Sequence, residues 1–179
     1  MDSIDNALNE VASLVGKNYV VQDLETLTFY STDIFSTANE QAVAIIRPGN
    51  ADELIHVSQI LIKNEVPLIV RGGGASYTGG YLPVVKNTIM IDTQRLKNIE
   101  INAEDMFVTV EPGVTWSELY EALKPLGLRT PFWGPFSGRV STIGGSMSYH
   151  AISHGTHNSV SADSLAGMQV VIGNGDVIE

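Results

Sequence analysis

A glycine cluster that directly follows a short apolar run is the feature that most constrains this fold. Five of the nine residues from Gly72 to Gly80 are glycine, and the run at 66–70 has the length and the branched side chains of a buried strand. Glycine adopts positive φ angles readily and lets several backbone N–H groups approach one anion. The pattern therefore predicts a strand that ends in an anion-binding loop, although the same glycines also suit a turn without a ligand.

The cluster does not match the two common nucleotide-binding loops. The Rossmann fingerprint G-x-G-x-x-G, counted from Gly72, needs a glycine where this chain has Tyr77. The Walker loop needs a lysine before its Ser or Thr, and no lysine lies between Lys63 and Lys86. A ligand-binding loop at this place must therefore belong to another class.

The glycine cluster ends a predicted strand–helix–strand unit. The run at 42–46 is short and rich in branched side chains, which is typical of a buried strand. Asn50 and Glu53 have the spacing of a helix capping box, and apolar residues recur behind them to about Glu65. We expect the strands at 42–46 and 66–70 to be parallel neighbours joined by a right-handed crossover.

The other elements follow from periodicity and from start and stop residues. Thr115 and Glu118 form a second capping box, and Gly127 is placed to end the helix behind it. The pair Asn174-Gly175 between two apolar segments is a strong hairpin signal. The remaining predictions are a helix at 3–15 that ends at Gly16, strands at 89–92, 107–110 and 168–172, and a loop of about forty residues before the last strand.

A composition shift near residue 95 predicts two lobes. We expect an N-terminal helix and lead-in at 1–29, a first subdomain at 30–95 and a second subdomain at 96–179. A second glycine cluster, from Ser141 to Ser146, lies in the long loop of the second lobe. Two amide-rich segments that open different lobes would suit an elongated ligand with a diphosphate in its middle, which favours the ligand-binding interpretation of the first loop.

Charge and composition exclude several classes of protein. The chain has 10 Lys and Arg against 20 Asp and Glu, a formal net charge of −10, which disfavours nucleic acid and anionic membrane surfaces as partners. The absence of cysteine excludes disulfides, Cys-ligated zinc and iron–sulfur clusters within this sequence. The N-terminal residues lack the pattern of a signal peptide, and no apolar run reaches membrane-spanning length, so the sequence predicts a cytoplasmic protein.

Taken together, the motifs resemble those of the FAD-binding domain of the vanillyl-alcohol oxidase/p-cresol methylhydroxylase (PCMH) flavoproteins. The similarity runs from about Tyr30 to the C-terminus, and four motifs follow one another in the order of the family. They are Arg71–Ser76, Glu111–Val114, Ser141–Gly145, and Ala162–Leu165 leading to Val170–Gly175. The resemblance implies an α+β, PCMH-type fold of two subdomains, in which the first contains the βαβ unit and the second is mixed or antiparallel.

The resemblance also implies which residues contact FAD. The first loop and the second glycine cluster would wrap the pyrophosphate, with Arg71 as the cation on the ligand side. The stretch through His150 and Gly155 would pass near the flavin ring. The predicted FAD-binding residues are Arg71, Gly72, Gly73, Gly74, Ala75, Ser76, Tyr77, Gly79, Gly80, Pro135, Ser141, Thr142, Gly144, Gly145, Ser146, Ser148, His150 and Gly155.

The sequence departs from the family pattern in one respect. Some members attach the flavin covalently through a histidine at the position held here by Ala75, and the chain has no cysteine, so no covalent link is predicted within this sequence. In the family a substrate-binding domain follows the FAD domain. Because the chain stops at Glu179 inside a predicted hairpin, we expect it to be the N-terminal portion of a longer protein whose C-terminal domain binds a small-molecule substrate.

Other residues that could carry chemistry have simpler interpretations. The histidines at 150, 154 and 157 have helical spacing, but Gly155 disfavours the regular helix that a metal-binding pair would need, so no metal site is predicted. His150 or His154 is either a neighbour of the flavin or an ordinary loop histidine. Residues expected to serve the structure alone are Asp33 in a turn or cap and Trp116 and Tyr120 in the core.

The activity that the resemblance implies is FAD-dependent oxidation of a hydroxy acid or an alcohol by hydride transfer to the flavin. No catalytic residue is assigned, because no carboxylate or histidine lies in a motif that dictates such a role. Two alternatives remain open. One is a non-catalytic flavin-carrying or electron-transfer subunit, and the other is an FAD-dependent transferase without net redox chemistry.

Overall fold

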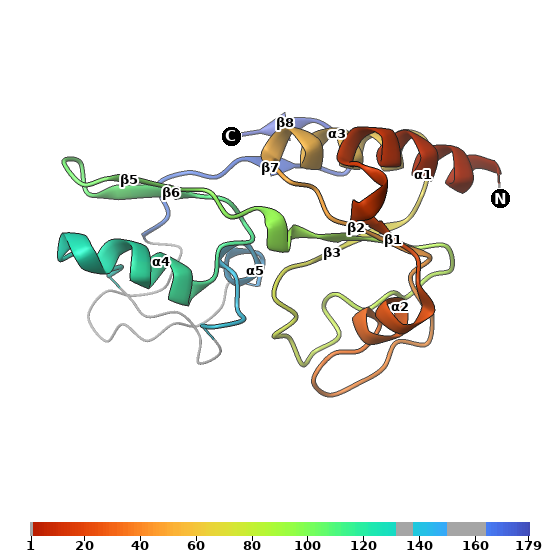
Figure 1. Cartoon of the computed structure of the whole chain (residues 1–179), viewed down its shortest axis with the longest axis horizontal. Helices are drawn as coiled ribbons and strands as arrows, with labels where there is room; N and C mark the ends of the chain where they lie inside the picture. Colours follow the sequence, from red (N-terminus) through yellow and green to blue (C-terminus); the bar gives the residue numbers. More distant parts are fainter. Residues whose placement is uncertain (1, 132–137, 150–163) are drawn as a thin grey trace. The chain divides into compact units, whose positions relative to one another are not determined.

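A four-stranded sheet organises the first part of the chain. The computed structural model describes residues 2–131, 138–149 and 164–179 (Figure 1). The chain divides into two units. The first comprises Met1–Arg71, Ser76–Arg95 and Gln169–Glu179, and the second comprises Gly72–Ala75 and Leu96–Met168. The main change from the first unit to the second thus comes after Arg95. Two short segments are exceptions, because Gly72–Ala75 belongs to the second unit and Gln169–Glu179 belongs to the first.

The sheet of the first unit has the strand order β1-β2-β4-β3. Its strands are β1 (Val20–Val21), β2 (Ala44–Ile46), β3 (Leu68–Arg71) and β4 (Ile89–Asp92). The strands β2 and β3 both run parallel to β4, but the prediction that they are direct neighbours is wrong because β4 lies between them. The reason is burial. All four residues of β4 are buried and suit the centre, whereas Val70 on β3 is 49% exposed and suits an edge.

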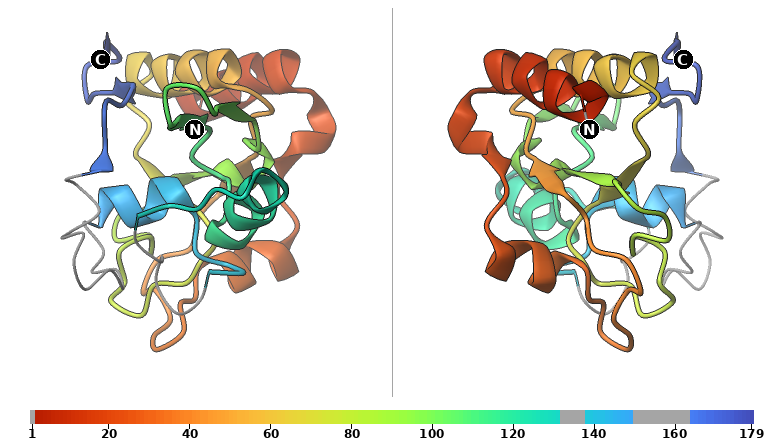
Figure 2. Two further views of the ribbon diagram at one scale, coloured as in Figure 1. Left: turned by 90° about the vertical axis from the view of Figure 1, so that its left-hand side faces the viewer. Right: turned by 90° about the vertical axis from the view of Figure 1, so that its right-hand side faces the viewer.

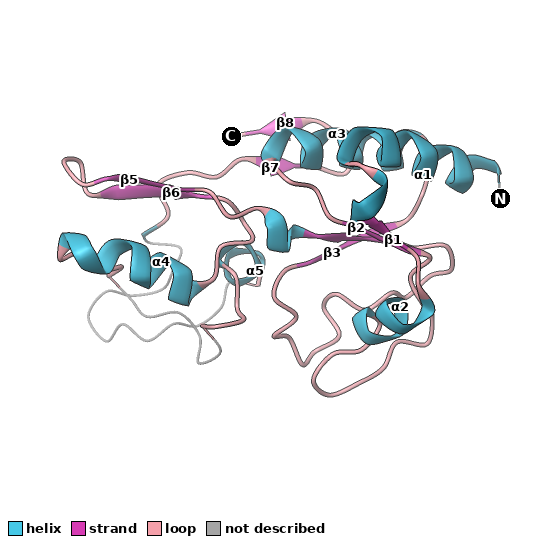
Figure 3. Ribbon diagram, viewed as in Figure 1, coloured by secondary structure: helices cyan, strands magenta, loops and turns pink. Residues whose placement is uncertain are grey.

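Helices cover both faces of this sheet (Figures 1 and 2). The helices α1 (Asp2–Val15) and α3 (Ala51–Lys63) pack on one face, and α2 (Leu24–Tyr30) packs on the other (Figure 3). Alternation along the strands explains this arrangement, since Ile46 contributes to the core under α1 and α3 while Ile45 contributes to the core over α2. The sequence indicated α1 and α3 correctly, whereas α2 was not predicted.

The predicted start and stop residues act as expected. The side chain of Asn50 accepts a hydrogen bond from Glu53 N at 2.8 Å, and the carboxylate of Glu53 accepts one from Gly49 N at 2.7 Å. Helix α1 ends where Gly16 takes a φ of 90°. The start of α3 and the end of α1 are therefore confirmed, and they hold the two helices that cover the sheet.

The second unit is built around a hairpin and one helix. Strands β5 (Ile99–Asn102) and β6 (Phe107–Val110) are antiparallel, and α4 (Trp116–Leu123) packs on them through Leu119 and Leu123. The capping box of Thr115 and Glu118 is present, and Gly127 has a φ of 68° beyond the end of the helix. Two elements were not predicted from the sequence, namely β5 and the short helix α5 (Ile143–Ser148).

The predicted hairpin near the end of the chain is confirmed. Strands β7 (Val170–Val171) and β8 (Val177–Ile178) are antiparallel, and Gly175 in their turn has a φ of 88°. The hairpin packs on α3, since Gln59 Nε2 donates to the carbonyl oxygen of Gly175 at 3.0 Å. This contact explains why the segment belongs to the first unit. Among the described residues, no helix has both the length and the apolar character needed to cross a membrane.

Substitution of Asn50 tests the cap that starts α3. Asn50→Ala is expected to lower the free energy of unfolding by about 1 kcal/mol, because Glu53 N loses its acceptor at the helix start. Asn50→Ser keeps a side-chain acceptor at the helix start without adding a charge beside Glu53 and is the matched control, with stability close to that of the original protein. Urea unfolding followed by circular dichroism measures both variants, and an equal loss of stability in the two would contradict the cap.

Candidate functional site

The glycine loop continues directly from β3. Arg71 is the last residue of that strand, and the loop runs from Gly72 to Gly80. Gly74 and Gly79 have φ angles of 71° and 73°, a backbone conformation that other residues adopt only with strain. At these two positions, the backbone conformation explains why the loop has glycine.

The two glycine clusters meet within the second unit. A Cβ on Gly72 would overlap Thr142 Oγ1, and a Cβ on Gly73 would overlap the carbonyl oxygen of Val140. A Cβ on Gly144 would lie 2.5 Å from the Cβ of Pro112. Close packing thus leaves no room for a side chain at these three positions, and the structure brings together the two segments that the sequence singled out.

The backbone amides at the start of α5 are used within the protein. Ile143 N donates to the carbonyl oxygen of Val114 at 2.7 Å, and Gly144 N donates to that of Pro112 at 3.0 Å. Gly145 N donates to Thr142 Oγ1 at 3.2 Å, and Ser146 N donates to the carbonyl oxygen of Thr142 at 2.9 Å. These bonds fix the second glycine cluster and commit its four amides within the protein.

Trp116 anchors this segment from α4. Its indole Nε1 donates to Ser146 Oγ at 2.8 Å, and both side chains are buried. The interpretation of Trp116 as a core residue is confirmed, while Tyr120 is half-buried on the same helix. Ser141 Oγ lies 3.4 Å from Ser146 Oγ, and Ser148 Oγ donates to the carbonyl oxygen of Gly144 at 2.8 Å.

Arg71 is a buried cation without an ion pair among the described residues. It is 6% exposed, and its guanidinium carbon lies 4.2 Å from the ring centre of Tyr30, 5.2 Å from that of Tyr81 and 5.9 Å from that of Phe29. Its Nε has no hydrogen-bond partner within the ranges that the structure describes. Aromatic faces stabilise a cation only in part, so this charge remains incompletely compensated.

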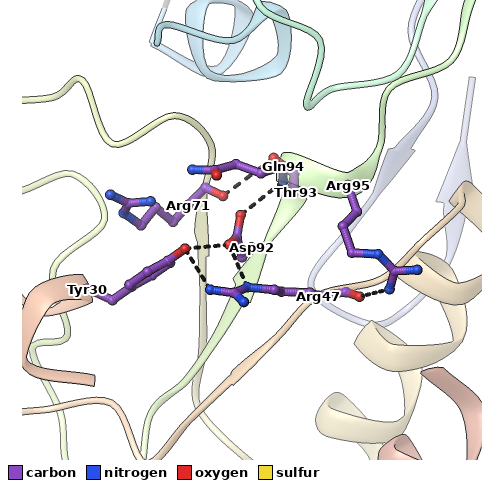
Figure 4. A network of polar contacts seen from close by, with 7 residues as sticks. All are labelled: Tyr30, Arg47, Arg71, Asp92, Thr93, Gln94 and Arg95. Atoms are coloured by element: carbon purple, nitrogen blue, oxygen red, sulfur yellow. Dashed lines mark hydrogen bonds and ion pairs between the residues drawn. The ribbon is translucent and has the colours of Figure 1, made fainter. Parts of the chain in front are cut away.

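The nearby carboxylate of Asp92 is committed to other partners (Figure 4). Asp92 Oδ2 accepts from Tyr30 Oη at 2.8 Å and from Arg47 Nε at 3.2 Å, and Asp92 Oδ1 accepts from Gln94 N at 2.9 Å. Arg47 Nη2 also donates to Tyr30 Oη at 3.0 Å. Because Asp92 is 1% exposed and has these donors, the network holds the ends of β2 and β4 together.

Sequence reasoning missed this network. An acidic residue at the end of a buried strand was the available signal, because an Asp in such a place needs partners. The partners Tyr30 and Arg47 come from distant parts of the chain, and no spacing rule connects them to Asp92.

Other predicted residues occupy different places. The side chain of Tyr77 is 68% exposed, Gly80 is also exposed, and Ser76 Oγ lies 3.2 Å from Thr78 Oγ1. Gly79 N donates to Asp33 Oδ2 at 2.8 Å, so this amide is also used within the protein. Predicted residues outside the described part of the chain are Pro135, His150 and Gly155, together with His154 and His157. Within the described part, no group of His, Asp and Glu could hold a metal ion.

The charge pattern around both glycine clusters suits an anion. Residues 66–91 and 122–162 contain no Asp or Glu, although the chain has 20 acidic residues. The first of these stretches contains Arg71 and the second contains Arg139. Although the protein is acidic, the sequence around both loops has no carboxylates. A phosphate group would therefore meet less electrostatic repulsion from these segments.

Comparison with known protein families gives a match over most of the chain. The family described as "FAD binding domain" matches residues 42–179. The glycolate oxidase subunit GlcD of Bacillus subtilis (strain 168) is 31% identical over 150 residues, which cover 83% of this chain and 32% of that protein. The mitochondrial D-lactate dehydrogenase [cytochrome] of Arabidopsis thaliana is 31% identical over 141 residues, which cover 75% of this chain and 24% of that protein.

Solved structures share the fold. The 4-ethylphenol oxidase of Gulosibacter chungangensis matches with a TM-score of 0.83 and 25% identity, over 99% of this chain and 34% of that one. The p-cresol methylhydroxylase matches with a TM-score of 0.79 and 21% identity, over 99% of this chain and 35% of that one. The predicted α+β, PCMH-type fold is confirmed, and the chain spans about a third or less of the relatives it matches.

The network around Asp92 gives a prediction for the ionisation of Tyr30. Burial raises the pKa of the Tyr30 phenol above its ordinary value of 10.0, and the negative charge of Asp92 raises it further. A raised pKa favours the neutral phenol in the folded protein. The resulting stabilisation is therefore complete below pH 10 and is lost as the pH rises through the raised pKa.

The measurement compares the original protein with Tyr30→Phe. The tyrosinate absorbance difference between the two, followed against pH, isolates the ionisation of Tyr30 and should be centred above the ordinary tyrosine pKa. The free energy of unfolding should also fall more steeply above that value in the original protein than in the variant. A Tyr30 ionisation at or below the ordinary pKa would contradict the described network.

Proposed function

The chain belongs to the FAD binding domain family, and on that basis we propose that it forms the FAD-binding part of a flavin-dependent oxidoreductase that oxidises a hydroxy acid. FAD is the cofactor that the family match indicates. The activity and the substrate belong to the proposal, because the chain covers only about a third of the glycolate oxidase subunit.

The residues of the two glycine clusters fit the diphosphate of FAD. The first loop and the segment at 140–144 approach each other so closely that Gly72 and Gly73 have no room for a side chain. The sequence around both loops is free of carboxylates, and Arg71 supplies a buried charge whose Nε lacks a partner. Two closely packed segments without carboxylates in their own sequence, next to a cation that is compensated only in part, suit an anionic group better than a neutral one.

Within this proposal, each segment has a distinct role. The backbone at Gly72–Ala75 and the hydroxyl group of Ser141 would hold the diphosphate, Arg71 would offset its charge, and Thr142 would support the loop from beneath through its contact with Gly72. The remaining proposed contacts are those made by Gly74, Ser76, Tyr77, Gly79, Gly80, Gly144, Gly145, Ser146, Ser148, Pro135, His150 and Gly155. When bound, FAD would accept a hydride from the carbon that bears the substrate hydroxyl.

The names of the relatives support the class of substrate. Both relatives with 31% identity are named for acids with a hydroxyl group next to the carboxyl group, glycolate and D-lactate. The alkyldihydroxyacetonephosphate synthase structures also share the fold, with TM-scores of 0.76 and 0.74 at 20% identity, a similarity that concerns the fold alone. Oxidation of a 2-hydroxy acid is therefore the function that we put forward.

A pair of variants at Ala75 tests the diphosphate site. Ala75→Asp places a carboxylate in the first loop without adding backbone strain, because the position already carries a Cβ. We expect its affinity for FAD to be about tenfold to a hundredfold lower than that of Ala75→Asn, which has the same shape and no charge. Titration of the purified apoprotein with FAD, followed by flavin fluorescence, gives both affinities. Equal affinities would contradict a diphosphate at this loop.

The substrate class is tested separately. In the absence of oxygen, D-lactate or glycolate should bleach the visible absorbance of the flavin bound to the full-length protein, because hydride transfer reduces it. A simple primary alcohol serves as the comparison and should leave the absorbance unchanged. Bleaching by the alcohol and not by either hydroxy acid would contradict the proposed substrate class. It would not contradict the assignment of FAD as the cofactor.

A further inference from the structure

Asp33 joins two segments of the first unit that are far apart in the sequence. Asp33 Oδ1 accepts hydrogen bonds from Phe35 N at 2.8 Å, from Ser36 N at 2.6 Å and from Ser36 Oγ at 3.2 Å. The other oxygen, Oδ2, accepts from Gly79 N at 2.8 Å. One carboxylate therefore closes its own turn, as the sequence predicted, and also holds the far end of the glycine loop, which the sequence did not indicate.

Two more hydrogen bonds tie the same segments together. Ile34 N donates to the carbonyl oxygen of Ser76 at 3.4 Å, and Tyr81 Oη donates to the carbonyl oxygen of Thr32 at 3.3 Å. Together with the bond to Gly79, these contacts fasten residues 76–81 to residues 32–36. Asp33 supplies the shortest of the three and the only one that involves a carboxylate.

The bond to Gly79 acts at a position where the backbone conformation is unusual. Gly79 has a φ of 73°, and glycine has many alternative conformations in a loop that nothing restrains. Hydrogen bonds from Ser36, Phe35 and Gly79 hold the pKa of Asp33 below its ordinary value, although partial burial opposes this, so the carboxylate is ionised near neutral pH. A charge-assisted bond of this kind is stronger than one between neutral groups.

We propose that Asp33 is a positioning residue for the cofactor loop, because its carboxylate holds Gly79 and thereby restricts the loop that meets the FAD diphosphate. This inference rests on the proposed function of the loop. Asp33 itself makes no contact with the cofactor in this arrangement. Its effect on FAD acts through the conformation of residues 76–80.

The two oxygens of Asp33 allow the two roles to be separated. Asp33→Asn in the orientation that keeps Oδ1 on Phe35 N and Ser36 N presents an amide NH₂ to Gly79 N, where two donors then face each other. Ser36→Ala removes only the hydroxyl bond to Oδ1 and leaves the bond to Gly79. The first variant therefore breaks the link to the loop, while the second disturbs the turn alone.

The expected results differ between the variants. Asp33→Asn should weaken FAD binding by about tenfold and should increase amide hydrogen exchange in a peptide that contains residues 76–81. Ser36→Ala should change neither quantity. Both measurements are made on the purified protein at a temperature where thermal unfolding curves show that all variants are folded, so a general loss of stability does not contribute.

Two outcomes would overturn the inference. Equal FAD affinity in Asp33→Asn and Ser36→Ala would show that the bond to Gly79 does not position the loop, and unchanged exchange at residues 76–81 would show that it does not restrain the loop. Failure of the proposed function is distinguishable, because Ala75→Asp would then bind FAD as well as Ala75→Asn. If the Ala75 variants differ and the Asp33 variant does not, only the positioning role fails.

Discussion

The contact between the backbone at Gly72-Gly73 and the segment Val140–Thr142 is the constraint on which the proposed site depends. It is possible only because neither glycine carries a side chain, since a Cβ at either position would overlap an atom of the other segment. The two clusters lie about seventy residues apart in the sequence, and both contribute to the second unit. The proposed site consists of two backbone segments, so it can form only if these segments lie in close contact.

The charges near the same site favour an anionic ligand. The chain carries a net charge of −10, yet the stretches at 66–91 and 122–162 contain no carboxylate. The carboxylate of Asp92 near Arg71 is already bound to Tyr30 and Arg47, and that of Asp33 points to backbone amides. Within the described part of the chain, Arg71 is thus left with aromatic rings around its guanidinium and no hydrogen-bond partner for its Nε. Such an arrangement is costly without an anion and favourable with one.

Much of the fold could be predicted because local rules determine it. Capping residues, apolar periodicity and the Asn174-Gly175 turn identified α1, α3, α4 and the last hairpin, and the four family motifs indicated the fold and the cofactor. The strand order could not be predicted, because the placement of β4 between β2 and β3 depends on burial in three dimensions. The internal use of the amides at 143–146 and the bond between Asp33 and Gly79 likewise depend on contacts between distant segments, for which spacing gives no signal.

The central claim is that this chain supplies the FAD site, and the most direct measurement is the visible absorbance of the purified full-length protein together with the identity of the flavin that it releases on denaturation. The account predicts the two absorption bands of an oxidised flavin and the release of FAD, not FMN or riboflavin, because the two glycine clusters are assigned to the diphosphate. A colourless protein that also fails to bind added FAD would contradict the account.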